Sequence, residues 1–321
     1  MCDDLRFIDL FAGVGGMRIP LEKRGLKCVF TSEIDSAARA TYSQNFGVDD
    51  SDIFGNLFEI EDVGADTVPD HDLLVAGFPC QPFSQAGKRK GFADQTRGTL
   101  FFSILQIILA KKPKAVLLEN VRGLLSQDMG RSFMIIFSSL EEAGYEVSHK
   151  VLNARDFGLP QNRQRLFIVA LRRDLAEQGP SFAFPEPVTD RDSLRLGDVL
   201  DEYPPEESLY ISDRIWASHK ARRLRNRELG RGFSYQLFTR DSNYAATISA
   251  RYYKDGSEIL IDEQDGKNPR KLSRQEALRL QGFPDWFLPH PSYAQATKQA
   301  GNAVPVPVVD AIVEKLLPLM S

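Results

Sequence analysis

The 321-residue sequence predicts a mixed α/β protein whose larger part is a doubly wound, mainly parallel sheet. Three observations favour this class. Short apolar runs alternate with amphipathic segments in the first third of the chain, a glycine-rich turn follows the first run, and polar residues follow several others. With 42% hydrophobic residues, the chain can bury one large core and a smaller second one.

The predicted elements follow in order along the chain. Strands are expected at LRFIDLF, KCVFTSE, HDLLVAG, KAVLLEN and LPQNRQRLFIVAL, and helices at residues 17–24, 35–45, 99–110 and 304–317. Ligands of such sheets lie at the carboxyl ends of the strands. The residues that follow each strand are therefore the candidates for chemistry.

Composition limits the class of protein. The three cysteines, Cys2, Cys28 and Cys80, form no C-x-x-C pair and only four histidines accompany them, so we expect neither disulfides nor a metal site. The N-terminus has no signal-peptide pattern, and the longest apolar run, Leu100 to Ala110, is too short to cross a bilayer. We expect a cytoplasmic protein with no membrane partner.

The charge distribution leaves two interpretations open. A net charge of −4 argues weakly against nucleic-acid binding. Locally, however, the segment from Lys220 to Arg231 carries six basic residues against the single acid Glu228. Such a run is either a solvated helix face or a phosphate-binding surface.

The glycine-rich turn indicates an adenosine cofactor. The sequence DLFAGVGG places at a strand-to-helix turn Phe11, Ala12, Gly13, Gly15 and Gly16. The dinucleotide fingerprint G-x-G-x-x-G needs a third glycine where Arg18 stands, which disfavours a nicotinamide cofactor. Glu33 ends the second strand, where a carboxylate can bind two ribose hydroxyls.

Four polar residues after later strands are candidates for catalysis. Cys28 lies within a strand and is interpreted as packing, whereas Cys80 opens a glycine-containing basic segment that resembles a mobile loop and is a candidate nucleophile. Glu119 follows the apolar run AVLL, which would raise its pKa; an acid and a helix cap both remain open. Arg163 and Arg165 share one strand face and are expected to meet an anion, a carboxylate or a base edge.

These motifs together carry a family resemblance. In order, the chain contains DLFAGVGG, GFPCQPFS, RGTLFF, ENVRG, PQNRQR, RKLSRQEALRLQGFP and QAGNAVPVPVV. It resembles the DNA (cytosine-5)-methyltransferases of the bacterial restriction-modification type. The resemblance implies a Rossmann-like, S-adenosylmethionine-dependent methyltransferase sheet in residues 1–173 plus 299–321, a smaller target-recognition domain in 174–270, and a hinge with a helix motif in 271–298.

The resemblance also implies a mechanism. Cys80 would add to C6 of a cytosine flipped out of duplex DNA, and protonated Glu119 would hydrogen-bond to N3. C5 would then accept the methyl group and lose its proton as Cys80 leaves. Arg163 matches the arginine that reaches the cytosine near O2, Arg165 one that positions the catalytic groups, and the loop from Gln81 to Gly98 would close over the base.

By the same resemblance, a set of residues would hold S-adenosyl-L-methionine. They are Phe11, Ala12, Gly13, Gly15, Gly16, Glu33, Ile34, Asn56, Leu57, Pro79, Leu100, Asn302 and Val304. Asn56 departs from the family pattern, in which an aspartate usually contacts the adenine amino group. Its side-chain oxygen can still accept that hydrogen bond.

Target recognition is assigned mainly to the predicted second domain. The segment ATISARYYKDGSEILI predicts a β-hairpin around Asp255 and Gly256 and is similar to segments that read sites with a CC...GG frame. Arg251 is either a guanine contact or a structural cross-strand arginine. The predicted DNA-binding residues are Gln81, Ser84, Lys88, Arg97, Arg251, Tyr252 and Lys254. Ser273 and Glu276 predict a capping box, and Gly282 a helix stop.

The expected partner is double-stranded DNA, and a cognate restriction endonuclease would act on the same site without direct contact. We expect a monomer. A tRNA cytosine-5 methyltransferase of the same family and a non-catalytic DNA-binding protein remain alternatives. An amino-group DNA methyltransferase is disfavoured because its proline-rich signature is absent from the sequence.

Overall fold

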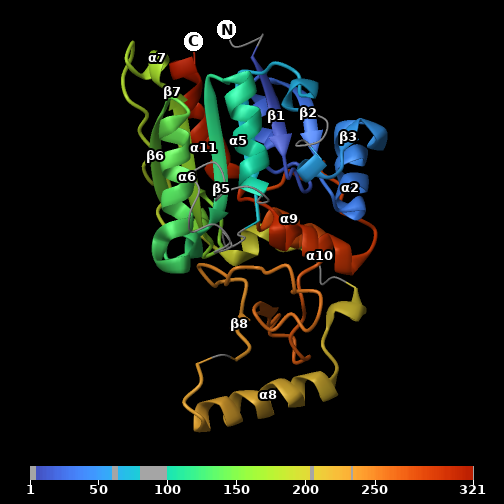
Figure 1. Cartoon of the computed structure of the whole chain (residues 1–321). Coiled ribbons are helices and arrows are strands. Elements are labelled where there is room, and N and C mark those ends of the chain that lie inside the picture. The colour runs from blue at the N-terminus through green and yellow to red at the C-terminus, as the bar shows by residue number, and fades with distance from the viewer. Residues whose placement is uncertain (1–4, 60–63, 80–99, 203–205, 233, 321) are drawn as a thin grey trace. The chain divides into compact units, whose positions relative to one another are not determined.

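The computed structural model describes residues 5–59, 64–79, 100–202, 206–232 and 234–320, which divide between two compact units (Figure 1). The first unit contains residues 1–152, 164–186 and 308–321, and the second contains 153–163 and 187–307. Residues 299–307 thus belong to the second compact unit, although the expected catalytic domain included them. Compact units are not functional domains, so the domain assignment stays a prediction.

A seven-stranded sheet forms the centre of the first unit. Its strands are β1 (Arg6–Leu10), β2 (Lys27–Ser32), β3 (Ile53–Phe54), β4 (Leu73–Gly77), β5 (Ala115–Val121), β6 (Tyr145–Asn153) and β7 (Gln164–Arg172). The strand order is β3-β2-β1-β4-β5-β7-β6. Strands β3, β2, β1, β4 and β5 pair in parallel, whereas β7 pairs antiparallel with β5. The mixed, mainly parallel sheet confirms the predicted fold class.

Buried side chains on both faces of the sheet explain its apolar strands. Leu73, Leu74, Val75 and Ala76 of β4 are all fully buried, as expected for a strand that is covered on both sides. The helices of this unit are α1 (Arg18–Lys23), α2 (Ser36–Phe46), α5 (Leu100–Lys111), α6 (Arg131–Glu142), α7 (Arg173–Ala176) and most of α11 (Val306–Leu316). Figure 1 shows α5 and α6 on one face of the sheet, and the three isoleucines of α5 and Ile136 of α6 pack in the same core as Leu74 and Ala76.

The last helix completes the first unit. Val308, Val309, Ile312, Val313 and Leu316 of α11 are all fully buried. Arg24, the residue that follows α1, forms two ion pairs with this helix. Its Nε lies 2.7 Å from a carboxylate oxygen of Asp310, and its Nη2 lies 3.1 Å from one of Glu314. Within the described residues, no helix combines the length and apolar character that a membrane crossing requires.

The second unit has little regular structure. Its elements are α8 (Asp213–Glu228), β8 (Leu237–Phe238), β9 (Leu260–Ile261), α9 (Arg274–Arg279) and α10 (Tyr293–Asn302). Strands β8 and β9 form a short parallel pair. The predicted hairpin around Asp255 is wrong, because residues 246–259 form turns and irregular structure and no strand. The buried Tyr252 fixes these turns: its hydroxyl donates to the Ile259 carbonyl and accepts from the Leu272 N–H, both at 2.8 Å.

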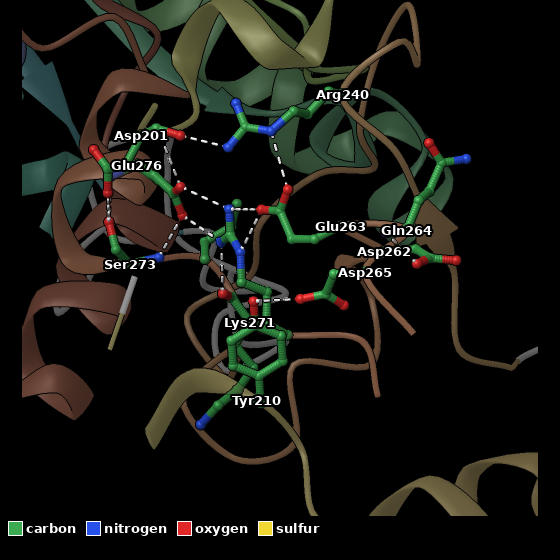
Figure 2. Close-up of polar contacts among 12 residues, drawn as sticks. Asp201, Tyr210, Arg240, Asp262, Glu263, Gln264, Asp265, Lys271, Ser273 and Glu276 are labelled. Atoms are coloured by element: carbon green, nitrogen blue, oxygen red, sulfur yellow. Dashed lines mark hydrogen bonds and ion pairs between the residues drawn. The ribbon is translucent and has the colours of Figure 1, made fainter. Parts of the chain in front are cut away.

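A buried ionic cluster precedes and caps α9. The predicted capping box is confirmed, with Ser273 and Glu276 each bonded to the other's backbone N–H. Glu276 also accepts two hydrogen bonds from the guanidinium of Arg270, at 2.7 and 2.9 Å, and both side chains are fully buried. Arg270 Nε donates to Glu263 at 2.7 Å, and Arg240 pairs with the same carboxylate. Figure 2 shows Arg240, Glu263 and Glu276 converging in this cluster.

Candidate functional site

The glycine-rich turn leaves open space at the carboxyl end of β1. Phe11 has φ of +54°, a left-handed conformation that strains a non-glycine residue and is typical of functional sites. Gly13 has φ of +56°, and a Cβ placed there would meet nothing within 4 Å. A Cβ on Gly15 would instead lie 2.2 Å from the Phe46 ring. Gly15 therefore allows α2 to pack, whereas Gly13 borders a space that a ligand can enter.

Glu33 is fixed beside this space. One carboxylate oxygen accepts the Gly13 N–H at 2.8 Å and the other accepts the Asp35 N–H at 2.7 Å. The next side chain, Ile34, is 68% exposed although it is large and apolar. A carboxylate and an uncovered apolar side chain next to a glycine turn suit a ligand that has hydroxyls and a flat apolar ring.

The other predicted cofactor residues of the first unit follow strands that align with β1 and β2. Register places Leu10 beside Ser32 and Ala76, and Ser32 beside Phe54, so the strands end at one sheet edge. The remaining predicted residues of this unit differ in burial. Gly16 and Leu57 are buried, Leu57 at 2% exposure, and Pro79 is exposed. The half-buried ones are Ala12, Asn56 and Leu100. In the second unit, Asn302 is exposed at the end of α10 and Val304 is buried.

Glu119 and Arg165 form an ion pair at the same sheet edge. Glu119 lies opposite Gly77 in the register of β4 and β5, and Arg165 Nε lies 3.0 Å from Glu119 Oε1. The two side chains are only 11% and 14% exposed. Burial lowers the pKa of Arg165 and the Glu119 carboxylate raises it, with burial the larger effect. The predicted carboxylate partner of Arg165 is thus present, and it is a candidate catalytic group itself.

Asn120 connects Glu119 to the segment that leads to Cys80. Its side-chain amide is buried and donates to the Phe78 carbonyl at 2.9 Å. This hydrogen bond holds the chain two residues before the candidate nucleophile. Cys80 itself lies outside the described residues, as do the predicted loop and the predicted DNA contacts Gln81, Ser84, Lys88 and Arg97.

Arg163 is buried just before strand β7. Strand β7 begins only at Gln164, and Arg163 lies before it in the second unit, with 1% of its surface exposed. Its guanidinium donates to the carbonyls of Ile248 at 3.1 Å, Gly301 at 3.0 Å and Ala303 at 2.6 Å. Three backbone carbonyls are thus among the partners of Arg163. Arg163 therefore holds two distant segments of the second unit together.

The predicted DNA contacts of the second unit differ in exposure. Arg251 and Lys254 are exposed, so their side chains are available to a ligand. Tyr252 is fully buried and both of its hydroxyl hydrogen bonds are to backbone groups. The assignment of Tyr252 to DNA is thus corrected, because its side chain fixes the turns of this segment from inside.

Comparison with known families identifies the protein. The family model described as C-5 cytosine-specific DNA methylase matches residues 5–318. The chain belongs to this family. It is a DNA cytosine-5 methyltransferase, and members of its family use S-adenosylmethionine as methyl donor.

Individual relatives of this methylase cover almost all of its length. It is 51% identical over 319 residues to the type II methyltransferase M.NlaX of Neisseria lactamica, covering 98% of this chain and 97% of that protein. It is 39% identical to the type II methyltransferase M.HhaI of Haemophilus parahaemolyticus, covering 96% and 93%. The crystal structure of S. pombe Dnmt2 methyltransferase superposes with a TM-score of 0.73 at 20% identity, covering 98% of both chains, which shows the fold.

The methylase has a buried polar cluster beneath the glycine-rich turn that the sequence analysis missed. Asp9 of β1 is 1% exposed, and the Tyr42 hydroxyl donates to it at 3.5 Å. Arg18 donates to the same hydroxyl at 3.1 Å, and its guanidinium lies 4.4 Å from the centre of the Phe46 ring. The sequence does contain a signal for this cluster, since Asp9 interrupts an apolar stretch that is predicted to be a strand. A carboxylate buried in such a strand requires polar partners.

Replacing Asp9 with asparagine is expected to change the pH dependence of stability. Burial raises the pKa of Asp9 to about 7 from the ordinary 3.8, so the folded protein binds a proton in this range that the unfolded chain releases. The free energy of unfolding of the wild type should therefore fall as pH rises from 5 to 7. Asp9 accounts for about 2 kcal/mol of this fall, because one proton linked to folding changes that free energy by up to about 1.4 kcal/mol per pH unit. Urea unfolding at both pH values measures the difference.

The matched control is Asp52→Asn, at an exposed position. Asp9→Asn should lose part of the decline with pH, whereas the Asp52 variant should retain it. Identical pH profiles for Asp9→Asn and the wild type would contradict the raised pKa.

Proposed function

We propose that this methylase transfers a methyl group from S-adenosylmethionine to C5 of a cytosine that is flipped out of duplex DNA, through a transient bond between Cys80 and C6. The main support is the buried Glu119–Arg165 pair at the carboxyl edge of the sheet. Glu33 and the Gly13 turn lie at the ends of strands along that same edge. A cofactor site and an acid for the base would thus lie on one edge of one unit.

The residues at the glycine-rich turn fit the cofactor. Glu33 would bind the ribose hydroxyls, the exposed Ile34 would cover one face of the adenine ring, and the space beside Gly13 would admit the methionine end. Asn56 would accept the adenine amino hydrogen bond. When bound, S-adenosylmethionine supplies the methyl group from a positively charged sulfur.

The side chains of this chain would make C5 reactive. The Cys80 thiolate forms a bond to C6, and Glu119 in its protonated form donates to N3, which stabilises the negative charge that develops on the ring. Arg165 fixes the Glu119 carboxyl group through its 3.0 Å contact. After methylation, loss of the C5 proton and breaking of the bond between Cys80 and C6 restore the aromatic ring.

The two arginines have different proposed roles. Arg165 contacts Glu119 and positions it, as the resemblance implies. Arg163 would reach the cytosine near O2, as the resemblance implies, and its two terminal nitrogens also donate to three backbone carbonyls. Through its hydrogen bond to the Ile248 carbonyl, Arg163 would also fix the position of the recognition segment, which continues from Ile248 to Arg251.

The likeness to type II methyltransferases supports a role in restriction-modification. The methylase would act as a monomer in the cytoplasm and protect sites that a cognate endonuclease cuts, without contact between the two proteins. The site would have a CC...GG frame, with Arg251 and Lys254 among the exposed residues that contact DNA.

Bisulfite sequencing at base resolution tests this function. DNA from a methylation-free host that expresses the wild type should contain protected cytosines in one short motif, and the Cys80→Ala variant should protect none. Isothermal titration of both proteins with S-adenosylmethionine provides the control, because Cys80→Ala should still bind the cofactor. Unprotected DNA together with methylated tRNA from the same cells would contradict the DNA assignment.

A further inference from the structure

Helix α8 is the most exposed and most basic element of the second unit. It carries six basic residues and two acidic ones over Asp213–Glu228, and His219 is its one buried residue. A helix that is polar almost all round has no apolar face to pack on a core, so it either bridges between domains or is stabilised by side-chain pairs along its own length. Figure 1 shows α8 along one side of the segment that contains β8.

One face of α8 is attached to the rest of its unit. The Trp216 ring packs against the Tyr235 ring with 4.8 Å between their centres, and Arg222 pairs with Asp255 at 3.3 Å. At the start of the helix, Asn268 donates to Asp213 at 2.7 Å. These contacts fix which way the helix faces.

The opposite face presents two rows of cations. Arg214 and Arg225 are eleven positions apart, about three full turns, so they lie on one line along the helix. Lys220 and Arg227 are seven positions apart, about two turns, and form a second line roughly 140° around the axis. All four side chains are exposed, and none of the four forms an ion pair within the described part of the chain.

Small and apolar side chains separate the two rows. The middle of the outward arc between them contains Ala217, Ala221 and Leu224, and the acids Asp213 and Glu228 lie in the same arc at the two ends of the helix; all five side chains are exposed. An α-helix with its side chains is about 10–12 Å wide, close to the roughly 12 Å width of the DNA major groove. Alanines allow close approach to the groove but cannot form hydrogen bonds with base edges.

We propose that α8 binds duplex DNA independently of sequence, with its two cation rows contacting the phosphates on either side of a groove. The proposal rests on the proposed function for its DNA partner. It adds a second kind of contact, because α8 would supply affinity while other residues of the methylase supply specificity. The cations on both flanks of the arc, whose middle carries only Ala217, Ala221 and Leu224, are complementary to two phosphate strands.

The salt dependence of binding tests the proposal. Each phosphate contact changes the slope of log affinity against log salt by about 0.9. A variant with Arg214, Lys220, Arg225 and Arg227 all changed to Gln should therefore reduce the slope for a 30-base-pair duplex by about 3 to 4, measured by fluorescence anisotropy. Glutamine retains helix propensity, and circular dichroism verifies the helix.

Two further variants make the result specific. A variant with Lys27, Lys112, Arg131 and Lys315 changed to Gln loses the same charge from exposed positions of the first unit and should retain the wild-type slope. Changing Arg214, Arg225 and Arg227 to Lys keeps the charge on α8 and should also retain it. The kcat at saturating DNA should be unchanged in the variant of the first unit.

An unchanged slope in the Gln variant of α8 would overturn the proposal even if the methylase modifies DNA. An unchanged slope together with lost binding to phosphatidylglycerol vesicles would replace it with a membrane surface. If the wild type methylates RNA and no DNA, the proposed function fails, and the duplex-binding slopes still decide whether α8 contacts phosphates.

Discussion

Changing Glu119 to glutamine is expected to lower kcat for methyl transfer by about 10²- to 10⁴-fold. Glutamine has the same shape, and its amide oxygen can still accept from Arg165, so the pair that fixes the side chain is retained. An amide cannot give a proton to N3, however. The negative charge on the cytosine ring would then develop without the acid that offsets it.

Single-turnover transfer of a labelled methyl group measures this effect directly. The affinity for S-adenosylmethionine should stay within about twofold, because Glu33 and the Gly13 turn are unchanged. The control is Glu141→Gln at an exposed position of α6, which should have the wild-type rate. A wild-type kcat for Glu119→Gln would remove Glu119 from the proposed mechanism.

Changing Arg270 to methionine is expected to lower the free energy of unfolding by about 3 to 5 kcal/mol. Arg270 and Glu276 are both fully buried, and Glu263 is 9% exposed at its side chain. Removing the guanidinium leaves two carboxylates without their common cation in a site that excludes water. Loss of one member of a buried pair costs far more than loss of an exposed pair.

Tryptophan fluorescence during urea unfolding reports this change, since both tryptophans, Trp216 and Trp286, lie in the second unit. Lys267→Met removes an exposed partner of Glu207 in the same unit and should change the midpoint little. The triple variant Arg270→Met, Glu263→Gln, Glu276→Gln should recover part of the loss. An Arg270→Met midpoint equal to that of Lys267→Met would contradict a stabilising role for the cluster.

The sheet of the first unit was predictable because its signals are local. Each strand is a short run with both faces buried, so apolar composition alone indicates β4 and β5. Glu119 was identifiable for the same reason, as a carboxylate at the end of such a run. The position of the glycine-rich turn followed from the glycines between β1 and α1.

The second unit was less predictable because long-range partners determine it. The Asp-Gly pair at 255–256 favours a hairpin locally, but Asp255 pairs with Arg222 of α8 and Tyr252 bonds to Leu272. The sequence also indicated that Arg163, in a segment that leads into a buried strand, needs polar partners, but it did not indicate which residues these are. They are carbonyls of residues 248, 301 and 303, far along the chain, and Gly301 permits them because a Cβ there would lie 2.3 Å from the Ser249 backbone.

The position of α11 has a consequence for synthesis of the protein. Five fully buried side chains of the first unit's core belong to residues 308–316, which leave the ribosome after the entire second unit. The sheet can form earlier, but its core stays incomplete until that helix emerges and Arg24 can meet Asp310. The unit that begins the chain is therefore finished last, and a nascent methylase becomes complete only after its second unit has been made.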